Sequence, residues 1–377
     1  MKKLLIASAV SAAFAVPTTA WAQAKAPTLA QVLDASGIGV NGYIDAAYSY
    51  ANRNIEASSG GFSNRVFDSQ NNSFALRQFG LIVLKQPKEG FGGVVNLTVG
   101  SDAQLIHSFP ETSASTFDLT QAYGQYATGS LTLMAGKFVT LSGTEVIWSP
   151  SNTTFSRSML FGAVPFTHTG VRAAYAVGDQ LTLYGGLNNG WDQLTDGNRG
   201  KTVVLGATYT PIKPLTLIAS AYSGKESATA TGAQTGTGPQ DTRNSLDFVA
   251  TWTITNAMSL GGEILYVSQD RPAGGAAKYN GAAVYFTYLF TPQWRVVTRG
   301  ELFDDKQNFH FAAPGVTAGS GVKYTEITVA GSYMPSNSME LRAEVRGDRA
   351  NTAVFVDSNG STGKSLQSLA LQGIYKF

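Results

Sequence analysis

Hydrophobic and polar residues alternate along most of this chain, in segments about ten residues long that recur from Ile38 to Phe377. Residues 339–348, MELRAEVRGD, show the pattern most clearly, because every second position is charged and the positions between are Met339, Leu341, Ala343, Val345 and Gly347. Successive side chains of an extended chain point to opposite faces. A period of two therefore predicts a β-strand with one charged face and one apolar face.

The connections between these segments alternate strictly between short and long. The short ones span residues 86–90, 127–130, 177–180, 210–214, 254–257, 290–294 and 334–338. The long ones span residues 52–72, 101–116, 139–167, 189–199, 224–243, 270–276, 304–321 and 348–364. Outer-membrane barrels are built this way, with short periplasmic turns and long external loops. The pattern predicts an all-β fold, a transmembrane antiparallel β-barrel of about 16 strands, within a range of about 14 to 18.

The predicted number of strands bears on function. A barrel closes in lipid because the bilayer offers no hydrogen-bond partner to an unpaired strand edge. About eight strands enclose a space that side chains fill, whereas about 16 leave an aqueous lumen. We therefore expect this barrel to surround water.

The N-terminus predicts export. Lys2 and Lys3 precede an apolar run over residues 4–16 and the sequence AWA at residues 20–22, the pattern of a secretory signal peptide with its cleavage site. The apolar run is shorter than the roughly 20 residues that a spanning helix needs. No later uninterrupted apolar segment reaches about 18 residues, which excludes a helical inner-membrane protein.

The predicted organisation has three parts: a cleaved signal peptide (1–22), a short periplasmic segment (23–37) and the barrel (38–377). The second part does not alternate. It is expected to be either a periplasmic tail or a short helix that lies in the periplasmic mouth of the barrel and stops at Gly37.

Composition removes several classes of function. The chain has 27 Lys+Arg and 25 Asp+Glu residues, and without Lys2 and Lys3 both signs are equally frequent. A neutral chain has no bulk electrostatic reason to bind nucleic acid or an anionic membrane surface. Cysteine is absent, which excludes disulfide scaffolds, thiol catalysis and cysteine metal sites.

Several segments resemble a known family. The stretches GYIDAAYSY (42–50), NSFALRQFGLIVLK (72–85), FDLTQAYGQY (117–126) and LTLMAGKF (131–138) are similar to the opening strands of the OmpL-like β-barrel porins of Gram-negative bacteria. The most specific stretch is GTEVIWSPSNTTFSRSMLFGAVPFTHTGVRAAY (143–175). The resemblance covers residues 38–225 and implies a porin-like channel in the outer membrane. It implies no ligand, because the family has no well-defined substrate.

The C-terminal strand points to the same membrane. In SLALQGIYKF the residues Leu369, Leu371, Tyr375 and Phe377 share one face, and the two aromatic rings would join the interfacial girdle of a barrel. A terminal strand of this kind resembles the signal that the barrel assembly machinery recognises. The expected partners are therefore outer-membrane lipid and, through Phe377, this machinery.

With the apolar faces turned to lipid, a set of charged residues points into the lumen. On the lipid face an Arg or Lys near the midplane would cost about 2–4 kcal/mol, which fixes this register. The predicted pore-lining residues are Arg77, Arg172, Asp247, Glu263, Arg295, Arg299, Glu301, Glu340, Arg342, Glu344 and Arg346. Pairs between neighbouring strands would stabilise the wall and stay hydrated. Because both signs are mixed, weak selectivity is expected.

The longest connection, residues 139–167, carries many apolar side chains that a freely solvated loop has little reason to keep. We expect this loop to fold into the barrel and narrow the pore, with Glu145, Trp148 and Arg157 at the constriction. The alternative is a packed cap above the barrel mouth.

Nothing in the sequence predicts catalysis, a metal or another cofactor. His107, His168 and His310 fall in or beside long connections without the spacing of metal ligands, so each is expected to be solvated. A hydrolase would need a Ser/His pair. His168, which lies beside Thr167 and Thr169, is a faint candidate for its histidine.

The predicted function is a passive outer-membrane channel for ions and small hydrophilic solutes, filtered by pore width and wall charge. A second hypothesis is a barrel without conductance, whose external loops bind a partner or surface ligand. Assembly into a homotrimer is expected only by analogy with general porins.

Overall fold

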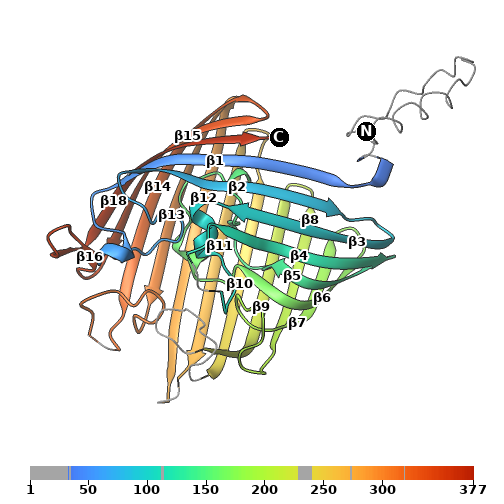
Figure 1. Ribbon diagram of the computed structural model, residues 1–377, viewed down its shortest axis with the longest axis horizontal. Coiled ribbons are helices and arrows are strands. Elements are labelled where there is room, and N and C mark those ends of the chain that lie inside the picture. The colour runs from blue at the N-terminus through green and yellow to red at the C-terminus, as the bar shows by residue number, and fades with distance from the viewer. Residues whose placement is uncertain (1–32, 34, 112–113, 228–239, 272–273, 318) are drawn as a thin grey trace, which may run out of the picture. The chain divides into compact units, whose positions relative to one another are not determined.

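The computed structural model describes residues 33, 35–111, 114–227, 240–271, 274–317 and 319–377 (Figure 1). The predicted signal peptide lies outside the described residues, as does most of the segment 23–37. Within that segment Leu33, Ala35 and Ser36 are helical. Residues Ile38 to Phe377 form one compact unit.

Sixteen of the described strands form one closed antiparallel barrel, in which each strand pairs with its neighbours in the chain and the first pairs with the last. They are β1 (Gly39–Ala51), β2 (Ser73–Lys85), β3 (Gly90–Val99), β4 (Phe117–Thr128), β5 (Leu131–Val139), β6 (Thr167–Val177), β7 (Leu181–Asn188), β8 (Thr202–Ile212), β9 (Leu215–Ser227), β10 (Gln240–Thr253), β11 (Met258–Asp270), β12 (Ala276–Thr291), β13 (Trp294–Asp305), β14 (Val322–Ser336), β15 (Met339–Ala350) and β18 (Ser365–Lys376). The predicted fold class is confirmed.

Short and long connections alternate as predicted. Residues 129–130 join β4 to β5, whereas residues 140–166 join β5 to β6. The long connections carry the remaining elements, which are the 3₁₀ turns η1 (Ala57–Ser59), η2 (Ser101–Leu105) and η3 (Ser149–Ser151), the one-turn helix α2 (Met159–Gly162), and a two-stranded sheet of β16 (Phe355–Val356) and β17 (Thr362–Gly363).

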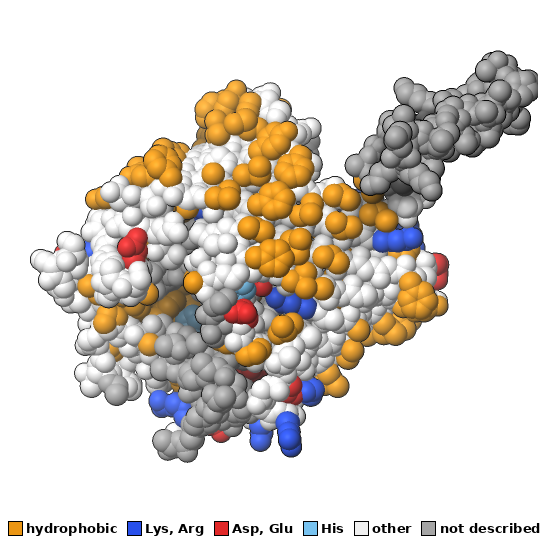
Figure 2. Space-filling view, viewed as in Figure 1, with side chains coloured by type: hydrophobic (Ala, Val, Ile, Leu, Met, Phe, Trp, Pro, Cys, Tyr) orange, Lys and Arg blue, Asp and Glu red, His pale blue; other side chains and the backbone are white. Residues whose placement is uncertain are grey.

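The two faces of the barrel strands differ as the alternation predicts. On β15, Leu341 and Val345 are 43% and 53% exposed, whereas Glu344 and Arg346 are each 3% exposed. Figure 2 shows hydrophobic side chains spread over the outer surface of the barrel. This arrangement suits a barrel in lipid, where apolar residues face outward and polar residues face the lumen. No helix among the described residues is long and apolar enough to cross a membrane.

The barrel closes where β1 meets β18. The Gly42 N–H donates to the Phe377 carbonyl at 2.9 Å, and the Phe377 N–H donates to the Gly42 carbonyl at the same distance of 2.9 Å. A Cβ atom at Gly42 would lie 2.4 Å from the Phe377 ring. Glycine at this position therefore lets the terminal ring lie against β1.

A hydrophobic cluster joins several long connections to the inner wall. The strands contribute Leu265, Tyr279, Phe303 and Tyr324, and the connections contribute Ile55, Phe62, Met159, Leu160, Trp191, Phe309 and Phe355. Burying these side chains against one another removes apolar surface from water. The connections are consequently packed onto the barrel rather than extended into solvent.

Candidate functional site

Residues 140–166, which we call the inner loop, lie against the inner wall of the barrel. Their hydrogen bonds reach inward-facing side chains of β2, β3, β9, β10, β11, β13 and β15. Val139 and Thr167 are paired across β5 and β6, so the loop leaves the wall and returns to it between two adjacent strands. Its contacts therefore cover much of the barrel circumference. That it narrows a conducting path stays a prediction.

Carboxylates of the wall accept hydrogen bonds from the backbone of the inner loop. Glu344 accepts from the Phe155 and Ser156 N–H groups at 2.7 and 3.0 Å. The same contact recurs at Glu301 (Met159 N–H at 2.8 Å and Leu160 N–H at 2.7 Å), Glu263 (Thr144 N–H at 2.8 Å) and Asp247 (Gly143 N–H at 3.2 Å). Buried N–H groups need acceptors, and ionised acceptors make the stronger bonds.

Arginines of the wall donate to carbonyl groups of the same loop. Arg342 donates to the Asn152 and Thr154 carbonyls at 2.8 and 2.7 Å. Two further contacts are Arg346 to the Arg157 carbonyl at 2.6 Å and Arg299 to the Ser156 carbonyl at 3.0 Å. Along β15, the inward residues at 342, 344 and 346 thus meet loop residues 152–154, 155–156 and 157 in order. The alternating charges match the alternating donors and acceptors of the loop backbone.

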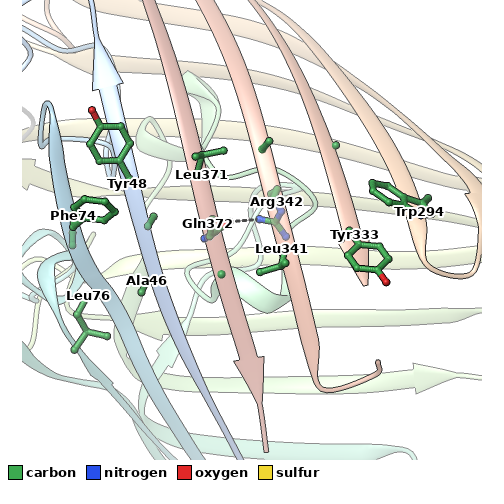
Figure 3. A pocket seen from close by; sticks show the side chains of 15 residues that line it. Ala46, Tyr48, Phe74, Leu76, Trp294, Tyr333, Leu341, Arg342, Leu371 and Gln372 are labelled. Carbon is green, nitrogen blue, oxygen red and sulfur yellow. Dashed lines mark hydrogen bonds between the residues drawn. The ribbon is translucent and has the colours of Figure 1, made fainter. Parts of the chain in front are cut away.

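Figure 3 shows the barrel wall at β15 and β18, with side chains that project from both of its faces. The Arg342 guanidinium donates to the Gln372 Oε1 atom at 2.9 Å, and both side chains are buried on the inner face. Leu341 and Leu371 are exposed and line an apolar groove of about 780 Å³ on the opposite side of the same strands. This groove belongs to the outer face and not to the lumen.

The wall charges are paired with one another as well as with the loop. The ion pairs are Arg77 with Asp102 at 3.2 Å, Arg295 with Glu340 at 2.5 Å, Arg299 with Glu326 at 3.2 Å, Arg342 with Glu340 at 2.8 Å and Arg346 with Asp348 at 2.7 Å. Each of these pairs lies on the inner wall or on the loop residues packed against it. Removing one partner of such a buried pair leaves an uncompensated charge.

The eleven residues predicted to line the pore all occupy inward positions, but the expected hydration of their charges is wrong for most. All of them except Arg172 and Arg295 are at most 5% exposed. The cause is the inner loop, which covers the wall and supplies the hydrogen bonds that water was expected to make. A role of these residues in conduction stays a prediction.

Two residues expected at the constriction hold the inner loop in shape. Arg157 is buried and donates to the Val146, Ile147 and Phe155 carbonyls at 3.0, 3.0 and 3.1 Å. Glu145 accepts from the Ser158 N–H group at 2.6 Å. These bonds link residues on either side of η3, so they stabilise the fold of the inner loop itself.

Burial and neighbouring charges together set the pKa values of Arg157 and Glu145. Burial lowers the pKa of Arg157 to about 10. Burial alone would raise the pKa of Glu145, but the guanidinium groups of Arg299, at 2.8 Å, and Arg157 hold it below its ordinary value. The third residue, Trp148, donates its Nε1–H group to the Asn96 side chain at 2.8 Å.

Sequence reasoning missed Glu326 on β14, which lies between two of the predicted arginines. Its carboxylate is 3.2 Å from the Arg299 guanidinium and 3.8 Å from that of Arg346. The signal was present, because alternation in VKYTEITVAG (322–331) puts Glu326 on the inward face with Tyr324 and Thr328.

The expectation of three solvated histidines is wrong. His168 is 1% exposed and its ring stacks on Tyr222 with centroids 4.8 Å apart. His310 lies among the aromatic rings of the loop cluster, and burial lowers its pKa to about 3. His107 lies 3.1 Å from the Asp118 carboxylate. Among the described residues no group of His, Asp and Glu side chains is arranged to hold a metal ion.

The wall of β4 to β8 keeps several inward side chains partly exposed. They include Tyr123, Arg172, Tyr184 and Thr208. Arg172 donates to the Val139 carbonyl at 3.2 Å and stacks over the Phe138 ring at 4.6 Å. This part of the wall retains contact with water where much of the remaining wall is covered.

Comparisons with known proteins agree with this architecture. A family model described as "Putative beta-barrel porin-2, OmpL-like" matches residues 37–377. A search among curated proteins finds no match. Among solved structures, the chain is similar to an anion-selective porin from Comamonas acidovorans, with 12% identity, 90% of this chain and 99% of that chain covered, and a TM-score of 0.64.

Two other solved structures give the same result. They are the outer membrane channel DcaP of Acinetobacter baumannii (14% identity, 90% and 97% covered, TM-score 0.60) and the trimer form of OmpT of Vibrio cholerae (11% identity, 90% and 99% covered, TM-score 0.60). At these identities the likeness concerns the fold. The family match extends over the whole barrel, and the chain therefore belongs to the OmpL-like β-barrel porins of the Gram-negative outer membrane.

Proposed function

We propose that this porin is a passive aqueous channel for ions and small hydrophilic solutes, with the inner loop as its constriction. Transport follows the gradient of the solute, because the proposal involves no energy source. A barrel of 16 strands is wide enough to enclose water. The inner loop then decides how much of that width remains.

The observation that carries the proposal is the attachment of the inner loop to both kinds of wall charge. Glu301 and Glu344 hold its N–H groups, and Arg342 and Arg346 hold its carbonyls. A loop fixed at so many points has a defined position, which a size filter requires. Because most wall charges are paired or hydrogen-bonded, they leave little net field, and this supports weak selectivity.

Assembly and oligomeric state are further parts of the proposal. OmpT of Vibrio cholerae is described in a trimer form, and we propose a homotrimer for this chain by analogy. The exposed terminal ring of Phe377, at the end of the last strand, supports recognition by the barrel assembly machinery.

The proposal is tested by recording currents from the purified protein in a planar lipid bilayer. We expect stable, stepwise increases in current as single channels insert. The same protein, unfolded by heat before addition, is the control and should give no steps. A correctly folded barrel that stays silent would refute the channel.

A second function is favoured by a specific observation. The hydrophobic cluster that joins Ile55, Trp191, Phe309 and Phe355 fastens several long connections together at the barrel mouth. Such packed loops suit a barrel that presents a rigid external surface to a partner and does not conduct. A silent barrel in the bilayer experiment would favour this function over the channel.

A further inference from the structure

Five of the six arginines predicted on the inner wall pair with carboxylates, and Arg172 does not. Arg77, Arg295, Arg299, Arg342 and Arg346 each lie within 4.0 Å of an Asp or Glu oxygen. The Phe138 ring lies between Arg172 and Tyr123, 4.6 Å from the guanidinium and with its centroid 6.4 Å from that of the Tyr123 ring, and Tyr184 is two residues from Gly186, the register partner of Arg172. Among the described residues, no Asp or Glu oxygen lies within 4.0 Å of the Arg172 guanidinium. Its positive charge is therefore not cancelled by a neighbouring acid.

Most of the hydrogen-bonding capacity of Arg172 is unused. One Nη1–H group donates to the Val139 carbonyl at 3.2 Å, and the Phe138 ring holds the guanidinium plane from one side. The Nε atom is buried and has no partner. A guanidinium carries five N–H donors, so this side chain is held in place with donors to spare.

The wall position beside Arg172 on β7 is a glycine. Arg172 pairs in register with Gly186 on β7, and no side chain projects from that position. A Cβ atom there would lie 2.5 Å from the Val171 carbonyl, so the close strand packing requires glycine. Position 186 therefore adds no side chain beside the guanidinium, and Arg172 stays partly exposed.

Tyr123 and Tyr184 can add two hydroxyl donors. The Tyr123 hydroxyl accepts from the Gln86 side chain at 3.2 Å, and the Tyr184 hydroxyl accepts from the Thr208 hydroxyl at 3.5 Å. A phenol that already accepts one hydrogen bond keeps its own proton free to donate. Both rings are partly exposed, as Arg172 is.

We infer that Arg172, with Tyr123 and Tyr184, forms a binding site for small anions on the partly exposed wall of β4 to β8 and gives the channel a modest anion preference. The inference rests on the proposed channel function. Chloride requires only the positive charge of the side chain. A carboxylate would in addition accept two parallel N–H bonds from the guanidinium fork. The wall acids Glu263, Glu301 and Glu344 do not compete for it, because loop N–H groups occupy them.

The test is the reversal potential of the reconstituted channel under a salt gradient, in potassium chloride and in potassium acetate. Wild type should pass both anions more readily than potassium. In Arg172→Gln the anion-to-cation permeability ratio should fall at least about twofold, the size expected when one unit charge is lost several ångströms from an ion in water. Arg172→Lys should keep the chloride preference and lose part of the acetate preference, because ammonium lacks the fork.

The matched control is Arg349→Gln, which removes an equal charge from an exposed position on β15. Its permeability ratio should equal that of wild type. An unchanged ratio in Arg172→Gln, or an equal drop in both variants, would overturn the site. If Arg172→Gln does not fold, the Tyr123→Phe/Tyr184→Phe double variant must lower the acetate preference, and an unchanged value would overturn the site. A wild-type barrel without current would instead refute the channel itself.

Discussion

At the scale of single residues, Glu344 shows how an inward charge acts in this barrel. Its carboxylate is 3% exposed and accepts hydrogen bonds from two successive loop N–H groups. Each of the two oxygens has one partner. The charge is therefore compensated by oriented backbone dipoles rather than by water, and its main consequence is to fix residues 155–156 against β15.

We predict that Glu344→Gln destabilises the folded barrel by about 1–3 kcal/mol. The substitution replaces one of the two acceptor oxygens by an NH₂ group, which faces a loop N–H group and leaves it without a partner. Equilibrium unfolding in urea with lipid vesicles, followed by tryptophan fluorescence, measures the change. Asp179→Asn, which removes a charge from an exposed turn, is the control. Equal unfolding midpoints for the two variants would contradict the prediction.

Alternation predicted the face of each inward residue but not what would cover it. Period two assigns Arg342 and Glu344 to the inner side because lipid penalises charge on the other. It contains no information about the contacts that residues 140–166 make after leaving β5. For that reason hydration was expected where the structure has loop backbone. His168 was misjudged for the same reason, since its burial depends on Tyr222 from another strand.

At the scale of elements, the inner loop is tied to the wall from its first residues. The Thr140 N–H group donates to the Phe166 carbonyl at 3.1 Å, which continues the pairing of β5 and β6. The Ser142 hydroxyl then lies 2.6 Å from the Ser220 hydroxyl on β9. The loop is thus held at its base as well as along β15.

We predict that the double variant Ser142→Cys/Ser220→Cys forms a disulfide without a loss of single-channel conductance. The two hydroxyl oxygens are in hydrogen-bond contact at 2.6 Å, so the two side chains point at each other as a disulfide requires, and the chain has no other cysteine to compete. Mass spectrometry and current recordings before and after reduction measure both results. The two single variants are the controls. Free thiols under oxidising conditions would show that the loop does not rest on β9.

The elements themselves were largely predictable. Residues 86–90, 254–257 and 334–338 were expected as turns, and each lies between the ends of successive strands or overlaps them by at most three residues. Turn signals and alternation are local properties, so the sequence displays them directly. The path of residues 140–166 is a long-range property. Its apolar residues indicated packing, but its partners on β10 to β15 are at least 104 residues away in the chain.

At the scale of the whole molecule, a barrel of 16 strands encloses the lumen, and the inner loop is attached to the wall inside it. The barrel sets the largest pore that the chain can form, and the loop sets the pore that remains. In the folded protein the wall charges hold the loop in place. Without the loop they would face water, which can hydrate them, so the barrel does not depend on the loop to avoid bare buried charge.

Because the barrel and the inner loop affect the pore size separately, the effect of removing the loop can be predicted. Val139 and Thr167 are paired in register, so a two-residue Asn-Gly turn in place of residues 140–166 can join β5 to β6 directly. We expect a folded barrel whose single-channel conductance rises at least about twofold, because 16 strands leave an aqueous channel once nothing occupies it. Replacing the exposed loop tip 358–361 by the same turn is the control and should leave conductance unchanged. If the loopless barrel conducted like the wild type, the ion path would not pass the inner loop, and the constriction would have to lie among the packed connections at the mouth.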